Sequence, residues 1–97
     1  MNVLRDPNSV RFATDAVLWI VDDSATDAER ARSSLEGDHE LRVFRDAAAM
    51  LEALAHGERP DVLLLDWRMP HTSGLEACRF VRERHDRASL PIVILTV

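Results

Sequence analysis

The sequence predicts an α/β domain in which helices cover both faces of a parallel sheet, a three-layer doubly wound arrangement. Apolar runs at residues 16–21 and 62–65 are not interrupted by polar residues, which indicates strands that are buried on both faces. Residues 92–96 predict the last strand, and segments with helical spacing separate the strands. Strands that alternate with helices are typical of right-handed crossovers in a parallel sheet.

Length and composition favour one small soluble domain. The 97 residues are 46% hydrophobic and 30% charged, as in ordinary globular proteins. A net charge of −5 argues against a nucleic-acid-binding surface on this domain. The single cysteine, Cys78, cannot form an internal disulfide, and the chain shows no apolar run of membrane-spanning length and no signal-peptide pattern. We therefore expect a cytoplasmic protein without membrane contact.

The individual elements follow in chain order. We expect residues 1–15 to be an N-terminal extension, because they show no period, and residues 16–97 to form the domain. Ser24 is a plausible N-cap for a first helix that ends at Gly37. The alternating residues 41–44 predict a short strand near the sheet edge.

The second half of the chain repeats this alternation. Residues 47–55 predict a helix that buries Met50, Leu51 and Leu54, with Gly57 as its stop signal. Residues 75–84 predict a third helix. Its expected buried stripe consists of Leu75, Cys78 and Val81.

Carboxylates follow two of the predicted strands. Asp22 and Asp23 come directly after the first strand, and Asp66 ends the central one. The carboxyl ends of parallel strands open onto one crevice, so these side chains are expected to meet there. Carboxylates that lie close together raise one another's pKa unless a cation binds between them. Mg²⁺ favours ligation by a few carboxylates that leave coordination positions open for water and a phosphate. The sequence therefore predicts a magnesium site.

Three motifs together resemble the receiver domain of two-component response regulators, the CheY-like family with a flavodoxin-like fold. They occur in the family's order and spacing over roughly residues 17–97. The motifs are Val21-Asp22-Asp23-Ser24, then Leu65-Asp66 followed by Met69-Pro70 and Ser73-Gly74, then Ile94-Leu95-Thr96.

The resemblance implies a role for each matched residue. Asp66 would accept a phosphoryl group, and Thr96 would hydrogen-bond a phosphoryl oxygen. Asp23 would bind Mg²⁺ directly and Asp22 through water, while Asp66 and the backbone carbonyl of Arg68 would complete the protein ligands. The structural alternatives are that Asp66 caps a turn, that Asp22 and Asp23 merely begin a loop, and that Thr96 is only a strand former.

The residues around these motifs have more modest expected roles. Gly74 is expected to permit a tight turn after Pro70, and Met69 to serve packing. Trp67 and Arg68 are expected to border the acidic pocket, where Trp67 could report metal binding optically. The histidines lack metal-ligand spacing; they are His39, His56, His71 and His85.

The resemblance also implies partners. A sensor histidine kinase or a phosphotransfer protein would supply the phosphoryl group, and an output domain or a downstream protein would read it. The domain would be a signalling module and not an enzyme. A different class, a pseudo-receiver that binds proteins without phosphorylation, stays open. An aspartyl-phosphate phosphatase is disfavoured, because its second Asp would stand where Arg68 is found.

The chain departs from the family in two ways. All 12 basic residues are Arg, so the Lys that contacts the phosphoryl group in the family has no counterpart here. The sequence also stops at Val97, at about the end of the fourth strand, without the family's last helix, strand and helix. We expect this strand to be a bare apolar edge. A fragment of a longer chain, or pairing with a second copy through that edge, would account for it.

Overall fold

The computed structural model describes residues 16–35, 39–69 and 72–95. Within them, strands and helices alternate along the chain. The elements are β1 (Ala16–Val21), α1 (Ala25–Ser34), β2 (His39–Phe44), α2 (Ala47–Ala55), β3 (Val62–Asp66), α3 (Gly74–Arg82) and β4 (Ile92–Leu95).

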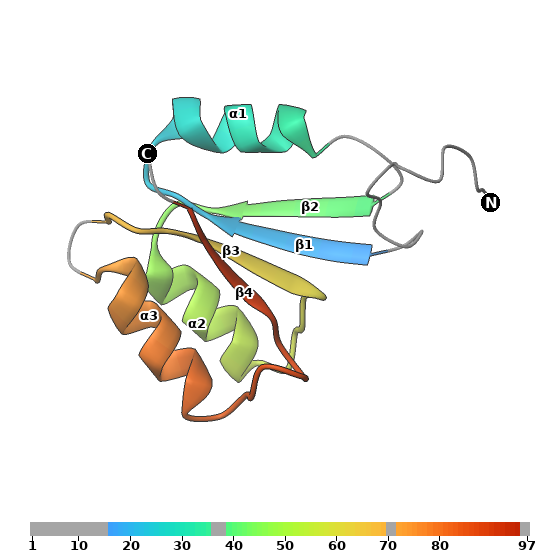
Figure 1. Cartoon of the computed structure of the whole chain (residues 1–97), viewed down its shortest axis with the longest axis vertical. Helices are drawn as coiled ribbons and strands as arrows, with labels where there is room; N and C mark the ends of the chain where they lie inside the picture. The colour runs from blue at the N-terminus through green and yellow to red at the C-terminus, as the bar shows by residue number, and fades with distance from the viewer. Residues whose placement is uncertain (1–15, 36–38, 70–71, 96–97) are drawn as a thin grey trace.

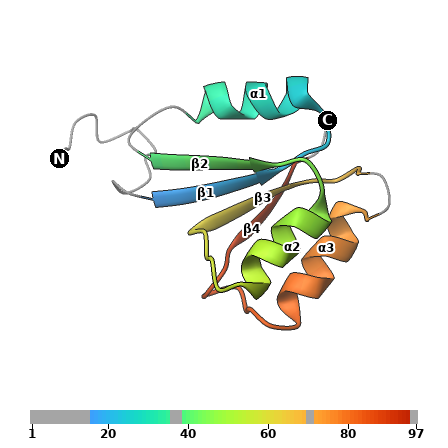
Figure 2. The same ribbon diagram turned by 180° about the vertical axis from the view of Figure 1, so that it is seen from behind.

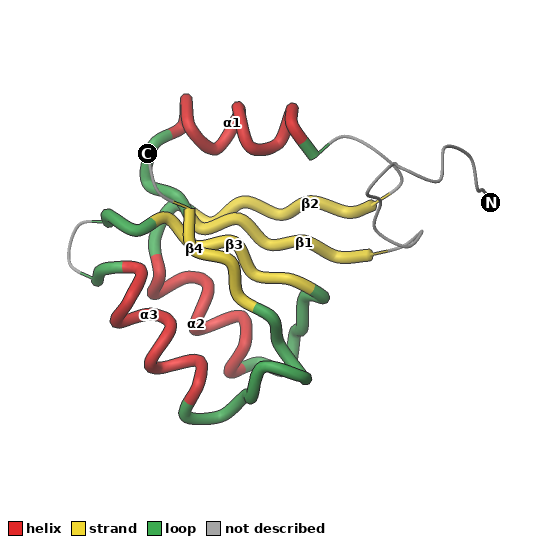
Figure 3. The backbone as a smooth tube through the Cα atoms, viewed as in Figure 1, coloured by secondary structure: helices red, strands yellow, loops and turns green. Residues whose placement is uncertain are grey.

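The described strands form one parallel sheet in the order β2-β1-β3-β4. Helix α1 covers one face, and α2 and α3 lie side by side on the other (Figures 1 and 2). The tube view shows the same three layers (Figure 3). The predicted doubly wound α/β fold is confirmed, and β2 lies at an edge of the sheet as expected.

The core has two layers, because successive strand residues point to opposite faces of the sheet. The two layers differ in size. The larger layer, between the sheet and α2 and α3, includes the buried side chains of Trp19, Phe44, Met50, Leu65 and Val81. The smaller layer, on the α1 side, contains Leu18, Ile20 and Leu64. Strands β1 and β3 contribute buried side chains to both layers. Their sequences therefore do not alternate between apolar and polar residues.

Each helix begins at a capping side chain. The Ser24 hydroxyl accepts the amide of Asp27, and the Asp46 carboxylate accepts that of Ala49. Ser73 and Glu76 form a reciprocal capping box at the start of α3. Gly57, just beyond α2, has a φ of 94°, in the left-handed region that favours glycine after a helix.

The predicted buried stripe of α3 is wrong at Leu75, whose side chain is 44% exposed. The helix begins at Gly74 and buries Gly74, Ala77 and Val81, with Cys78 partly buried against the core. Positions i, i+3, i+4 and i+7 share one helix face, so a stripe that starts at position 74 turns Leu75 away from the sheet. The close approach of Gly74 to the backbone of Asp66 sets this rotation.

Strand β4 lies at the other edge of the described sheet. Its Ile92 and Ile94 pack against the larger core layer, whereas Val93, on the α1 side, is 46% exposed. Among the described helices, none combines the length and the apolar character needed to cross a membrane. Residues 1–15, Gly37, Pro70, His71 and Thr96 lie outside the described residues, so the expectations placed on them stay predictions.

Candidate functional site

Three acidic side chains come together at the carboxyl ends of β1 and β3. These strands are neighbours, with Val21 opposite Leu65, so the residues that follow them emerge side by side. One carboxylate oxygen from each of Asp22, Asp23 and Asp66 lies within 4.8 Å of the other two. The structure thus brings together the three carboxylates that the sequence placed at this edge.

Backbone hydrogen bonds hold Asp22 in place. Its amide donates to the carbonyl oxygen of Phe44 at 3.0 Å, which continues the β1–β2 pairing by one residue. Its Oδ1 accepts the amide of Ser24 at 2.9 Å. One carboxylate oxygen of Asp22 is therefore bound to the loop that follows β1.

Burial and neighbouring negative charges disfavour the ionised form of Asp22. Asp22 is only 4% exposed, and burial raises its pKa above the ordinary value of 3.8. The hydrogen bond from the Ser24 amide opposes this rise in pKa, whereas the charges of Asp66, Asp27 and Asp23 add to it. A bound cation would remove the repulsion, so the site is preorganised for a positive ion.

Gly74 packs directly against the backbone of Asp66. A Cβ atom on Gly74 would collide with the Asp66 carbonyl oxygen and would lie 3.1 Å from its carbonyl carbon and 3.2 Å from the Trp67 Cα. The φ of Gly74 is outside the left-handed region, so the expected role in a tight turn is not the reason for glycine here. The glycine is needed for close approach of two backbones.

Backbone hydrogen bonds connect the loop between β3 and α3 to β4 and to the start of α3. The Trp67 amide donates to the Leu95 carbonyl at 3.0 Å, and the Gly74 amide donates to the Trp67 carbonyl at 3.1 Å. The Trp67 side chain is 45% exposed and Arg68 is exposed, while Met69 is partly buried against the core, as expected.

One residue at the site was missed by the sequence interpretation. Arg45 follows the edge strand β2, and its Nη2 donates to the carbonyl oxygen of Asp23 at 2.8 Å. The signal that could have found it is positional, because the carboxyl end of a parallel strand next to β1 must open onto the same edge. No pattern in residue type marks it.

The donor set fits Mg²⁺. All three groups are carboxylates, one is buried with a raised pKa, and hard oxygen ligands are what this ion prefers. The resemblance to receiver domains also implies the backbone carbonyl of Arg68 as a ligand. Arg68 follows Asp66 by two residues in the loop after β3, and its part stays a prediction.

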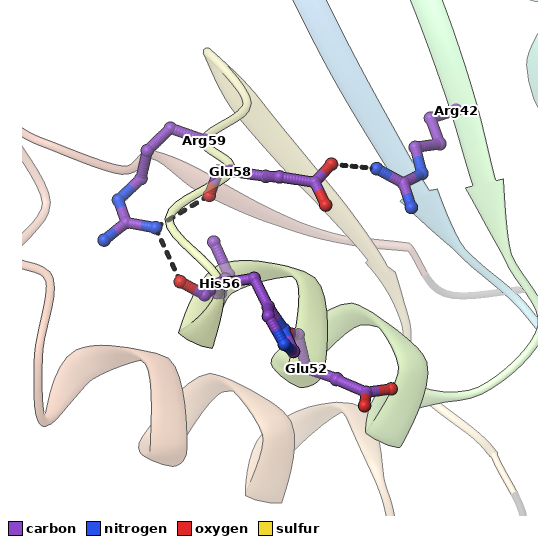
Figure 4. A network of polar contacts seen from close by, with 6 residues as sticks. Arg42, Glu52, His56, Glu58 and Arg59 are labelled. Atoms are coloured by element: carbon purple, nitrogen blue, oxygen red, sulfur yellow. Dashed lines mark hydrogen bonds and ion pairs between the residues drawn. The ribbon is translucent and has the colours of Figure 1, made fainter.

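A second polar network lies near the amino end of β3 and has a structural character (Figure 4). Arg42 pairs with Glu58 and lies over the rings of Trp19 and Phe44. Arg59 donates to two backbone carbonyls, at 2.8 and 2.7 Å. The His56 ring contacts the Glu52 carbonyl at 2.8 Å. The His56 and Arg59 side chains bind backbone carbonyls in the last turns of α2.

Comparison with known proteins identifies the family. The family model for the response regulator receiver domain matches residues 18–97. This chain belongs to that family. Among curated relatives, the response regulator MprA of Mycobacterium ulcerans is 40% identical over 80 residues, which cover 81% of this chain and 33% of MprA. The DNA-binding transcriptional regulator NtrC of Escherichia coli K12 is 37% identical over 81 residues, 82% of this chain and 17% of NtrC.

Solved structures agree with this assignment. The chemotaxis response regulator CheY4 of Vibrio cholerae matches with a TM-score of 0.72 and 29% identity, over 84% of this chain and 68% of CheY4. The Mn²⁺-bound form of the response regulator Rcp1 matches with a TM-score of 0.69 and 29% identity, over 84% and 65% of the two chains. The chain spans about a third of MprA and less of NtrC.

The receiver family accounts for the general character of the site. Receiver domains are signalling domains of two-component systems and not classical enzymes, and they generally bind Mg²⁺ in an acidic pocket. Response regulators act with histidine kinases and with output domains. The identification of the family and the predicted flavodoxin-like fold are confirmed.

Proposed function

We propose that this receiver accepts a phosphoryl group on Asp66 from a phosphohistidine, in a reaction that depends on Mg²⁺. The donor is a sensor histidine kinase or a phosphotransfer protein. The observation that carries the proposal is the convergence of Asp22, Asp23 and Asp66 within 4.8 Å at one sheet edge. Asp66 ends β3 and is half-buried, so its carboxylate is both held by the strand and open to a donor.

The proposed transfer forms one bond and breaks another. A carboxylate oxygen of Asp66 attacks the phosphorus, and an O–P bond forms while the P–N bond to the donor imidazole breaks. The imidazole nitrogen keeps the electron pair of that bond and takes up a proton. The product is an acyl phosphate on Asp66 and a neutral donor histidine.

The other site residues hold the reactants. Asp22, Asp23, Asp66 and the Arg68 carbonyl would hold Mg²⁺, which when bound neutralises charge on the phosphoryl oxygens. Thr96 would hydrogen-bond a phosphoryl oxygen. The close packing of Gly74 against the Asp66 backbone would restrain the position of the accepting carboxylate.

We also propose how the domain is used. Residues 16–97 form the receiver domain and residues 1–15 an extension, in the cytoplasm. Phosphorylation shifts an existing equilibrium between two surface states. Because NtrC is a DNA-binding regulator and this chain matches only 17% of it, an output domain or a downstream protein would deliver the response.

Intact mass after incubation with acetyl phosphate and Mg²⁺ tests the proposal. We expect a single phosphoryl adduct that disappears when Mg²⁺ is chelated and in Asp66→Asn. An adduct that survives in Asp66→Asn would contradict the assignment of Asp66, and so would one that forms without a divalent ion.

A second candidate function, a pseudo-receiver that binds proteins without phosphorylation, is favoured by one observation. All 12 basic residues among the 97 are Arg, so none of these residues is a Lys that could contact a phosphoryl group. Titration of Trp67 fluorescence with Mg²⁺ separates the cases if no adduct forms. Retained binding indicates an intact acidic pocket, and loss of binding indicates a receiver in fold only. Trp67→Phe is the control, since the other tryptophan, Trp19, is buried.

A further inference from the structure

The end of the edge strand β2 is fastened to the loop that carries the acidic pair. Phe44, the last residue of β2, accepts the amide of Asp22 at 3.0 Å through its carbonyl oxygen. The next residue, Arg45, donates from Nη2 to the carbonyl oxygen of Asp23 at 2.8 Å. Two consecutive residues at the end of one strand therefore hold two consecutive residues after its neighbour.

The Arg45 contact holds a residue that lies outside the helices and strands. Asp23 lies in a bend between the end of β1 and the start of α1. Its carbonyl is bound by a guanidinium, a charged donor that makes a stronger hydrogen bond than a neutral one. Because the peptide unit after Asp23 is planar, fixing its oxygen also limits rotation of the residue that carries the carboxylate.

We propose that Arg45 is a positioning residue for the metal site. By holding the Asp23 backbone, it keeps the Asp23 carboxylate directed at Asp22 and Asp66 and so strengthens the binding of a divalent cation. The inference rests on the proposed Mg²⁺-dependent function and adds a residue that the family's motifs do not include.

The charge of Arg45 and its hydrogen bond have opposite effects on cation binding. A guanidinium beside the site repels an incoming cation, but Arg45 is exposed, so water and salt screen that repulsion. The orientation of Asp23 does not depend on salt in this way. If positioning dominates, loss of Arg45 weakens cation binding; if repulsion dominates, loss of Arg45 strengthens it.

The test is a Mg²⁺ titration of the 97-residue chain, followed by Trp67 fluorescence. We expect Arg45→Ala to weaken Mg²⁺ affinity about 3- to 10-fold, the change in an equilibrium constant that one typical net hydrogen bond produces. Arg45→Lys keeps the charge and a hydrogen-bond donor group, and we expect it to recover part of the affinity. Thermal unfolding in chelator checks that each variant is folded. If Arg45→Ala does not fold, Arg45→Lys takes its place in the Mg²⁺ titration.

Arg59→Ala is the matched control. It removes the same charge and another set of guanidinium-to-carbonyl hydrogen bonds (Figure 4). Arg59 precedes the amino end of β3, whereas Asp66 ends that strand at the acidic edge. We expect its Mg²⁺ affinity to equal that of the unaltered chain.

A second readout separates positioning from general damage. In phosphorylation by acetyl phosphate, Arg45→Ala should raise the Mg²⁺ concentration needed for half-maximal rate but leave the rate at saturating Mg²⁺ nearly unchanged. A merely structural role would lower the saturating rate in Arg45→Ala and Arg59→Ala alike.

The outcomes are distinct. Unchanged or tighter Mg²⁺ binding in Arg45→Ala would overturn the positioning role while leaving the proposed function intact, and an equal loss in Arg59→Ala would do the same. Failure of the unaltered chain to bind Mg²⁺ would overturn the proposed function and this inference together.

Discussion

At the scale of single residues, Asp22 carries an electrostatic cost, because it is buried beside other carboxylates. Its folded pKa is raised, so its contribution to stability is fully present below pH 3.8 and is lost as pH rises through the folded pKa. In chelator, we expect Asp22→Asn to unfold at higher urea than the unaltered chain at pH 7, by about 0.5 to 1.5 kcal/mol, and this advantage should vanish near pH 3.

Urea unfolding from pH 3 to 7 measures this difference, with Glu40→Gln as control because Glu40 is an exposed carboxylate on β2. A difference that does not change with pH would contradict the electrostatic explanation. With saturating Mg²⁺ we expect the order to reverse, because the variant then loses a metal ligand.

Gly74 makes a separate residue-scale prediction. Gly74→Ala should cost about 1 to 3 kcal/mol, as overpacking does, and should weaken Mg²⁺ binding because the Asp66 backbone must move. Gly57→Ala is the comparison: its φ of +94° strains any side chain, but nothing lies within 4 Å of the added atom. We expect Gly57→Ala to lower stability without changing Mg²⁺ affinity, and equal effects on affinity would refute the close-approach argument.

Residue types at strand ends were the part of the site that the sequence could predict. A carboxylate that closes an apolar run has no packing role, so the residue pattern alone was enough to single out Asp22 and Asp66. Arg45 was not predictable in this way, because an arginine after an edge strand is common and its partner is a backbone oxygen, which leaves no trace in residue type.

At the scale of elements, α3 depends on its first turn. Ser73 and Glu76 satisfy two backbone amides reciprocally, and Ser73 also starts the helix that presents Gly74 to Asp66. We expect Ser73→Ala to cost about 1 kcal/mol, measured by urea unfolding. Ser33→Ala on exposed α1 should cost less than about 0.5 kcal/mol. Equal costs would mean that the capping box does not stabilise the fold.

Helix α3 also shows the limit of periodicity. Its sequence permits stripes that begin at position 74 or 75, and hydrophobicity alone favours Leu75 over glycine. The rotation is set instead by a tertiary contact between backbones, which hydrophobic spacing does not report. Helix α2 was predicted with its observed bounds, and Gly57, the expected stop signal, lies just beyond its last turn.

At the scale of the whole molecule, the two faces of the sheet are covered unequally. Helices α2 and α3 cover one face, whereas α1 covers the other over β1 and β2 (Figure 1). Within the described sheet, β4 has a strand neighbour on one side only, and Val93 is 46% exposed on the less covered face. Such an edge favours pairing with another chain.

We therefore expect the 97-residue chain to self-associate as its concentration rises, which sedimentation velocity measures. Val93→Glu should shift the equilibrium toward monomer by placing a charge on the edge strand. Phe80→Glu is the matched control, because Phe80 is 48% exposed but lies on α3. A stable, folded monomer at all concentrations would contradict this expectation.

We propose that Asp66 itself receives the phosphoryl group, and chemical mapping of the phosphorylated chain tests this assignment. Borohydride reduces an acyl phosphate of aspartate to homoserine, which tandem mass spectrometry locates in the sequence. After treatment with acetyl phosphate and Mg²⁺, we predict homoserine at position 66 and unchanged aspartate at positions 22 and 23. Homoserine at position 22 or 23, or at none of the three, would contradict the assignment of Asp66 as the acceptor.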